Sequence, residues 1–267
     1  MKKLSKKRFV FGFIFLGAFI GALFLGSQIF LWTQGTTIVA NQQRTATSDS
    51  TTTSTSETPS ASDLPAVSPT DWDLVLVGPN NQIIEEVAAD QLTAISGSEE
   101  VDSRIVDAYN QLASAAEAAG YPLVVVSAFR SVADQQQVYD ASVNRRMSEE
   151  NISYEQAVEE TNVQVTQPGY SEHHTGLAID VVDSDWYNNY SNYASDMLDP
   201  LFGEQPAAQW LAANCAQYGF IIRYPEGRED ITGITYEPWH LRYVGVDSAE
   251  YITSHNLTLE EYLALFN

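Results

Sequence analysis

The sequence predicts an α+β fold, a single domain in which a small, mainly antiparallel sheet is flanked by helices. Segments with strand-like and helix-like periodicity follow one another in mixed order, without the regular alternation of a parallel sheet. The portion from residue 71 to 267 has about 200 residues, the size of one domain. Because 44% of the chain is hydrophobic, this portion can bury a sizeable core.

The first 70 residues differ in composition and are expected to lie outside this domain. Residues 1–8 are strongly basic, and residues 9–32 are a 24-residue run in which only Ser27 and Gln28 are clearly polar. That length spans a bilayer, and the basic end stays in the cytoplasm. We therefore expect a single-pass anchor that places the domain outside the cell. A cleaved signal peptide is the alternative, although its apolar core is usually shorter.

Residues 33–70 are expected to form a disordered tether between anchor and domain. They contain TSDSTTTSTSETPSAS, which has too few large apolar side chains to offset the entropy of ordering. A flexible chain of this length spans roughly 30 Å. The tether can therefore hold the domain clear of the membrane.

The domain is expected to begin with two short strands, at 74–78 and 82–87, around the turn signal Pro79-Asn80-Asn81. An amphipathic helix at 105–119 then ends at Gly120, and a buried strand follows at 123–126.

The second half continues with the same two kinds of pattern. Helices are expected at 132–147 and within the acidic segment 151–166, and a strand at 178–182. The remaining signals are a helix at 205–218 that ends at Gly219, a strand at 239–244, and a last helix begun by the capping box of Thr258 and Glu261.

Charge and cysteine content exclude several classes of protein. From residue 69 onward the chain has 7 Arg, no Lys and 32 acidic residues, a net charge of −25. Nucleic acid is excluded as a partner, because phosphate binding needs clustered Lys and Arg. The single Cys215 allows no disulfide and no thiolate cage, and is expected to be a buried core thiol. A disulfide-free exported protein suits a bacterial surface, which we expect to be Gram-positive.

Three of the four histidines fall in two short motifs, SEHHTGLAID at 171–180 and EPWHLRY at 237–243. A catalytic zinc ion takes about three N or O ligands and keeps one position open. His173, Asp180 and His240 would supply two imidazoles and a carboxylate to one Zn²⁺. Taken singly, His240 could be a core residue and His173 a loop residue, but the two ordered motifs together favour a shared metal site.

Glu237 is the candidate catalytic base. It lies three residues before His240, where its carboxylate could take a proton from water at the metal. Pro238 argues against a helix, so this is not the helical HExxH motif. We expect the edge of a strand with a turn.

Together with SAFRS at 127–131, these motifs resemble the zinc D-alanyl-D-alanine carboxypeptidases of the VanY type, which are related to the VanX-type dipeptidases and bacterial L,D-carboxypeptidases. The resemblance covers residues 88–266 and implies a zinc site in a cleft on the sheet. It implies that Arg130 contacts the substrate near its scissile carbonyl or terminal carboxylate. The remaining roles that it implies are zinc binding by His173, Asp180 and His240, and base catalysis by Glu237.

Two departures from the family pattern affect this assignment. Many relatives have another residue at the position of His174, whose imidazole competes with His173 as the ligand. The spacing to Gly176 and Asp180 favours His173. The acidic insertion at 148–165 is expected to reshape the rim of the cleft and so to affect substrate preference.

Arg130 and its neighbours are the candidates for substrate binding. A guanidinium binds a carboxylate or an oxyanion through two parallel hydrogen bonds, and a surface salt bridge is the alternative role for Arg130. Ser127, Gln137 and Ser171 are further candidates for hydrogen bonds to the substrate, with helix capping or turn formation as the alternative.

The resemblance implies that the chain hydrolyses the C-terminal D-alanine from peptidoglycan stem peptides. The nearest alternative is an L,D-carboxypeptidase that shortens tetrapeptide stems. A non-catalytic module that binds the cell wall is a third hypothesis, and the presence of Glu237 argues against it because binding needs no base.

Overall fold

The computed structural model describes residues 63–266. The predicted basic tail 1–8, the anchor 9–32 and the tether as far as residue 62 lie outside the described residues. Between residues 63 and 266, no helix has the length and apolar character needed to cross a bilayer. Leu64 and Val67 already pack against a cluster of buried side chains, so packing begins before residue 71, where the domain was expected to start.

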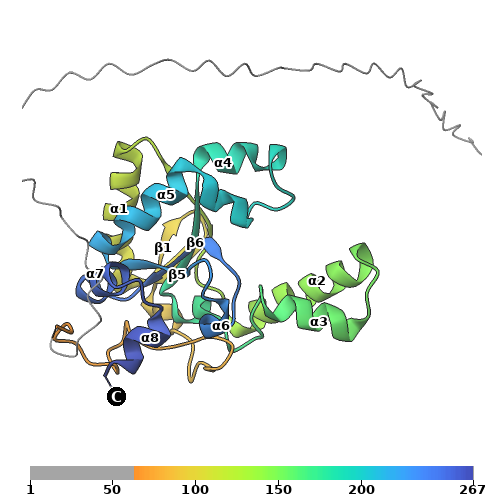
Figure 1. Cartoon of the computed structure of the whole chain (residues 1–267), viewed down its shortest axis with the longest axis horizontal. Helices are drawn as coiled ribbons and strands as arrows, with labels where there is room; N and C mark the ends of the chain where they lie inside the picture. Colours follow the sequence, from red (N-terminus) through yellow and green to blue (C-terminus); the bar gives the residue numbers. More distant parts are fainter. Residues whose placement is uncertain (1–62, 267) are drawn as a thin grey trace, which may run out of the picture. The chain divides into compact units, whose positions relative to one another are not determined.

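The described residues form an α+β domain, as predicted (Figure 1). Its strands are β1 (Leu92–Ser96), β2 (Glu99–Asp102), β3 (Leu123–Ser127), β4 (Ala178–Asp183), β5 (Phe220–Tyr224) and β6 (Glu237–Tyr243). Its α-helices are α1 (Val106–Ala118), α2 (Val132–Glu149), α3 (Tyr154–Asn162), α4 (Ser184–Asn189), α5 (Pro206–Asn214), α6 (Glu229–Thr232), α7 (Val246–Ser254) and α8 (Leu259–Ala264). The 3₁₀ turns are η1 (Ala89–Gln91), η2 (Ser103–Ile105), η3 (Glu172–Thr175), η4 (Tyr190–Asn192), η5 (Pro200–Glu204) and η6 (Cys215–Tyr218).

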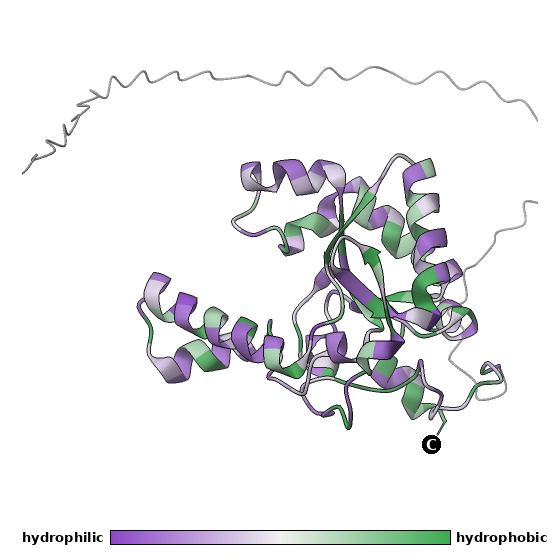
Figure 2. Ribbon diagram, turned by 180° about the vertical axis from the view of Figure 1, so that it is seen from behind, coloured by the Kyte–Doolittle hydropathy of each residue, from purple (hydrophilic) through white to green (hydrophobic). Residues whose placement is uncertain are grey.

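The main sheet has four antiparallel strands in the order β3-β4-β6-β5. All six residues of β4 are buried, as are the first six of β6, so both faces of the sheet centre are covered. Helices α1 and α5 pack against one face. Ile179 and Leu241 lie opposite each other on β4 and β6 and belong to the main hydrophobic core. Figure 2 shows hydrophobic segments in the sheet and on the helices beside it, together with a hydrophilic stretch inside the sheet.

The register of the two central strands positions two polar side chains. Asp180 of β4 pairs with His240 of β6, one position along from the pair of Ile179 and Leu241. Successive side chains of a strand point to opposite faces, and directly paired residues share a face. Asp180 and His240 therefore lie together on the face opposite to Ile179 and Leu241.

Helices α2 and α3 form a hairpin that extends away from the sheet, which we call the arm, residues 132–162 (Figures 1 and 2). The arm has a small hydrophobic cluster of its own, built on Tyr139, Val143 and Ala157. Ser153 caps α3, and Gln156 completes a capping box. The predicted helices of this region are confirmed, and the arm includes most of the acidic insertion.

The strands predicted at 74–78 and 82–87 are wrong. Their backbone groups bond to other partners: the carbonyls of Asp73 and Val75 accept hydrogen bonds from the Arg242 guanidinium, and the N–H groups of Ile83 and Val87 donate to the loop before β4. The turn between them is present, as an antiparallel bridge of Gly78 with Asn81. The sequence analysis missed the hairpin of β1 and β2 and the strand β5.

Several local predictions are confirmed. Gly120 and Gly219 follow the ends of their helices with φ of +93° and +82°, conformations that favour glycine. Thr258 and Glu261 form the predicted capping box at α8. Cys215 is a buried thiol, and burial raises its pKa to about 12.

Candidate metal centre

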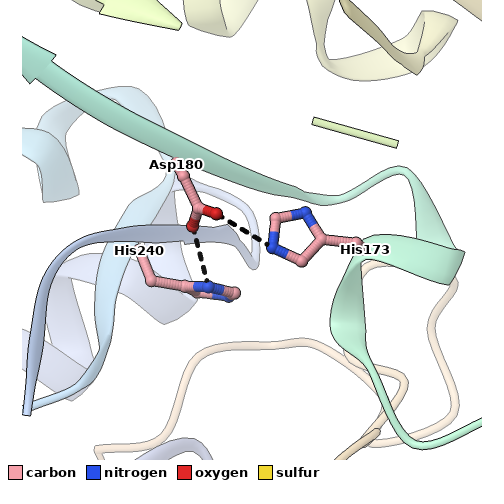
Figure 3. A group of neighbouring side chains, drawn as sticks. All are labelled: His173, Asp180 and His240. Atoms are coloured by element: carbon pink, nitrogen blue, oxygen red, sulfur yellow. Dashed lines mark ion pairs between the residues drawn. The ribbon is translucent and has the colours of Figure 1, made fainter. Parts of the chain in front are cut away.

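His173, Asp180 and His240 come together from three elements, η3, β4 and β6 (Figure 3). One ligand atom from each residue lies within 4.8 Å of the others, and all three side chains are buried. Asp180 Oδ2 is 3.3 Å from His173 Nε2, and Asp180 Oδ1 is 3.1 Å from His240 Nδ1. The structure therefore brings the three predicted zinc ligands into one cluster.

Each imidazole presents a different nitrogen to the cluster. His173 donates a hydrogen bond from Nδ1 to the carbonyl of Ala128 at 2.6 Å, which leaves its Nε2 facing Asp180. Nε2 of His240 lies 3.3 Å from Glu172 Oε2, which leaves its Nδ1 facing Asp180. Such outer hydrogen bonds are usual for histidines that ligate metals.

Asp180 supplies the test of whether a cation fits here. Its Oδ1 is buried, and no hydrogen-bond partner for it exists among the described residues. Burial raises the pKa of Asp180, but His173 and His240 outweigh that effect and hold the pKa below its ordinary value. An ionised carboxylate whose two oxygens face two imidazole nitrogens, one of the oxygens having no donor, suits a cation. Two nitrogens and one oxygen are a donor set that fits zinc.

His174 is held away from the cluster. Its Nδ1 donates to the carbonyl of Arg130 at 2.7 Å, and its Nε2 accepts from the N–H of Gly169 at 3.1 Å. Both nitrogens are therefore used in joining two loops. The structure places His173, and not His174, beside Asp180.

Glu237 stands beside the cluster, with Oε2 3.5 Å from Nδ1 of His240. Residues three apart on a regular strand would face opposite ways, but β6 is irregular here. Ile222 pairs with Leu241, whereas Tyr224, two residues on, pairs with Glu237, so β6 has two extra residues at this point. Glu237 lies in this irregular stretch, and its carboxylate reaches the same side as His240.

The buried position of Glu237 changes its acidity. Burial raises the pKa of Glu237 to about 8, and the nearby carboxylates of Asp180 and Glu172 act in the same direction. A bound dication would favour the ionised form again. Glu237 can therefore exchange a proton near neutral pH, as a general base or acid requires.

Arg130 borders the same cavity as the cluster. Its guanidinium donates to Ser127 Oγ at 2.7 Å and to Gln135 Oε1 at 2.8 Å. Six of the seven arginines in residues 63–266 have a carboxylate within ion-pair distance, and Arg130 is the exception. A surface salt bridge therefore does not explain Arg130, whose charge is available to an anionic ligand.

Of the other predicted substrate contacts, the structure brings only one to the cavity. Ser171 borders the cavity and also accepts a hydrogen bond from the N–H of His173. Ser127 holds Arg130 and does not border the cavity. Gln137 is exposed and bonds to Asp134, so the structure does not bring it to the site. Gln135 borders the cavity instead. Side chains two positions apart on a helix point in directions that differ by roughly 200°, so Gln135 and Gln137 face different ways.

Glu172 is a residue of the site that the sequence analysis missed. It is 1% exposed and lies between the buried guanidinium groups of Arg223 and Arg242. Its place inside the SEHH motif was the available signal. Its partners lie 51 and 70 residues further along the chain, and no local pattern connects them.

The cavity has a volume of about 630 Å³ and extends well beyond the metal cluster. Its lining includes one face of α2 and most residues of the segment 195–200. The α2 face includes Gln135, Val138, Ser142, Arg145 and Glu149. Arg145 and Asp196 approach within 3.6 Å of each other from these two segments.

Comparison with known proteins gives a consistent result. Residues 98–246 match the family model described as VanY, D-alanyl-D-alanine carboxypeptidase. YodJ of Bacillus subtilis (strain 168) is 40% identical over 159 residues, which are 58% of this chain and 50% of YodJ. The chain thus spans about half the length of that curated relative.

Two solved structures share the fold. One is a vancomycin resistance D,D-pentapeptidase VanY variant in complex with Zn(II), 34% identical, with a TM-score of 0.61, covering 72% of this chain and 99% of that one. The other is the LD-carboxypeptidase LdcB, also 34% identical, with a TM-score of 0.58, covering 72% of this chain and 85% of that one.

Proposed function

We propose that this chain, which belongs to the VanY family of D-alanyl-D-alanine carboxypeptidases, is a zinc peptidase that removes the C-terminal D-alanine from peptidoglycan stem peptides. The observation that carries the proposal is that Arg130, a cation without an acidic partner among residues 63–266, borders the same cavity as the metal cluster and Glu237. A carboxypeptidase must bind a terminal carboxylate beside the bond that it cleaves, and this cavity offers both functions.

The roles of the residues follow from their positions. His173, Asp180 and His240 would hold zinc, which acts as a Lewis acid towards water and the scissile carbonyl. Glu237 accepts the proton that the attacking water loses and returns it to the leaving amine. Arg130, held by Ser127 and Gln135, binds the substrate's terminal carboxylate and so fixes the position of the scissile bond.

The length of the cavity favours a stem peptide over a free dipeptide. From Gln135 to Glu149, α2 adds roughly 20 Å of wall beyond the residue that holds Arg130, at about 1.5 Å per residue. Arg145 and the acidic side chains near it give this wall charged groups that can bind the part of the stem peptide upstream of the scissile bond. We therefore expect pentapeptide stems to be hydrolysed faster than D-alanyl-D-alanine.

An L,D-carboxypeptidase is the second candidate, supported by the likeness to LdcB. The two activities share the metal, the base and the carboxylate-binding arginine, and differ in the stereochemistry of the residue before the scissile bond. Incubating the purified full chain with defined pentapeptide and tetrapeptide stems, and weighing the products by mass spectrometry, distinguishes them. Loss of one alanine from the pentapeptide alone supports the first candidate.

The same experiment tests catalysis itself. Chelation of zinc should abolish hydrolysis, and added zinc should restore it. Stoichiometric zinc together with peptidoglycan binding, but without turnover of either stem, would contradict both candidates and support a non-catalytic module that binds the cell wall.

We also propose that residues 9–32 anchor the chain and hold the domain at the outer face of the cytoplasmic membrane. The support is the 24-residue apolar run after a basic end. In cells that have lost their wall but keep an unbroken membrane, protease added to the outside should release the domain from the membrane fraction. Recovery of the chain from the medium with a new N-terminus after residue 32 would favour a cleaved signal peptide.

A further inference from the structure

Glu172 is a buried carboxylate to which the mechanism above assigns no role. Its side chain has no exposed area. Its Oε1 accepts hydrogen bonds from Nε of Arg223 and Nη1 of Arg242, both at 2.7 Å. Its Oε2 is 3.3 Å from Nε2 of His240. The carboxylate thus has one oxygen for the two arginines and one for the imidazole.

The two arginines are held by other groups as well. Arg223 makes a two-point contact with the Glu260 carboxylate, at 2.9 and 2.7 Å. Arg242 donates through Nη2 to the carbonyls of Asp73 and Val75, at 3.0 and 2.7 Å. Because both guanidinium groups are fixed, Oε1 of Glu172 is committed to them, and Oε2 is directed to His240.

We propose that Glu172 is a positioning residue that sets the tautomer of His240. Its Oε2 can only accept, so it holds a proton on Nε2 of His240, and a cation bound beside Nδ1 and Asp180 would take the lone pair of Nδ1. This inference rests on the proposed metal site, for which Nδ1 of His240 must be unprotonated. The other ligand imidazole needs no such side chain, because the Ala128 carbonyl fixes the tautomer of His173.

The substitution Glu172→Gln tests the proposal. The arginines offer only N–H groups, so the amide oxygen of glutamine would turn to them and its NH₂ group would face His240. Nε2 of His240 would then have to accept, and the proton would move to Nδ1, the nitrogen that faces the metal. We expect zinc affinity, measured by competition with a chromogenic chelator, to fall roughly 10–100-fold.

Glu260→Gln is the matched control. It weakens the same network through Arg223, yet Glu260 makes no hydrogen bond or ion pair with His240. Zinc affinity should stay at the wild-type value in this variant. An equal loss in both variants would mean that network stability, and not the tautomer of His240, governs zinc binding, and would overturn the proposal. Unchanged affinity in Glu172→Gln would do the same.

A measurement on the wild-type chain covers the case in which Glu172→Gln does not fold. The chain has four histidines, so ¹⁵N-histidine labelling gives a simple NMR spectrum of ring nitrogens. In the zinc-loaded full chain, we expect His240 to be protonated on Nε2 and His173 on Nδ1. A proton on Nδ1 of His240 would overturn the proposal. These readouts do not depend on peptidase activity, so failure of the proposed function remains distinguishable.

Discussion

The central sheet and the arm differ in how firmly they hold the groups that border the cavity. Asp180, His240 and Glu237 lie on paired central strands and are at most 9% exposed. The cavity-facing side chains of the arm instead include Arg145, which is 52% exposed and pairs with the exposed Asp196. The sheet holds the proposed metal ligands and base in one geometry, whereas the outer part of the arm makes exposed contacts. The exception is Gln135, a buried residue of the arm that holds Arg130.

The largest effect is expected on the sheet, for Glu237→Gln. Glutamine keeps the shape of the side chain but accepts no proton, so turnover of the stem peptide should fall roughly 10²–10⁴-fold. Zinc content, measured by atomic absorption, should not change, because Glu237 is not among the three clustered ligands. Near wild-type turnover with zinc bound would remove Glu237 from the catalytic role.

A smaller effect is expected for Arg130→Lys, because an ammonium group cannot reproduce the planar contact of a guanidinium with a carboxylate. The kcat/KM for the preferred stem should fall about tenfold or more, equal to about 1.4 kcal/mol. Arg145→Lys is the matched control on the arm, since Arg145 borders the same cavity but pairs with Asp196. Equal losses in the two variants would contradict a specific role for Arg130 in binding the terminal carboxylate.

Gly176→Ala should lower stability and disturb the loop that carries His173. Gly176 has a φ of +68°, which costs other residues roughly 1–2 kcal/mol. A Cβ there would also lie 2.8 Å from the backbone N of Asp102. Gly97→Ala is a control for the strain alone, because its φ is +56° with nothing within 4 Å of the added carbon. We expect both variants to lower Tm, Gly176→Ala by the larger amount because of the added clash, and zinc binding to weaken only in Gly176→Ala.

The smallest effect is expected on the arm, for Ser153→Ala, which removes the N-cap of α3. Loss of such a cap costs about 1 kcal/mol. Hydrogen exchange in α3 should accelerate, while zinc affinity and the hydrolysis of short substrates stay unchanged. A change in zinc affinity would mean that the arm and the metal cluster are coupled.

The sequence analysis succeeded where the information is local. The three residues of the metal cluster lie in two short motifs, and the helix ends at Gly120 and Gly219 depend on a conformation that glycine adopts readily. Spacing favoured His173 over His174, and the structure gives the reason, since both nitrogens of His174 are occupied elsewhere.

It failed where distant residues decide the structure. Residues 74–78 have the apolar pattern of a strand, but Arg242, far along the chain, takes the carbonyls of Asp73 and Val75. Gln137 was the predicted candidate, but Gln135 borders the cavity, because the phase of α2 against the cavity separates two side chains of the same chemistry. Glu172 is likewise defined by arginines on two other strands.

Because Asp180 pairs with His240, the metal site forms only when β4 and β6 pair in the correct register. A slip of β4 against β6 by one residue would place one of the two on the opposite face. The two strands are far apart along the chain, so the ligands meet only after a late, long-range pairing has formed. Metal uptake would then mark the end of maturation outside the cytoplasm, and a misregistered chain would stay metal-free and inactive.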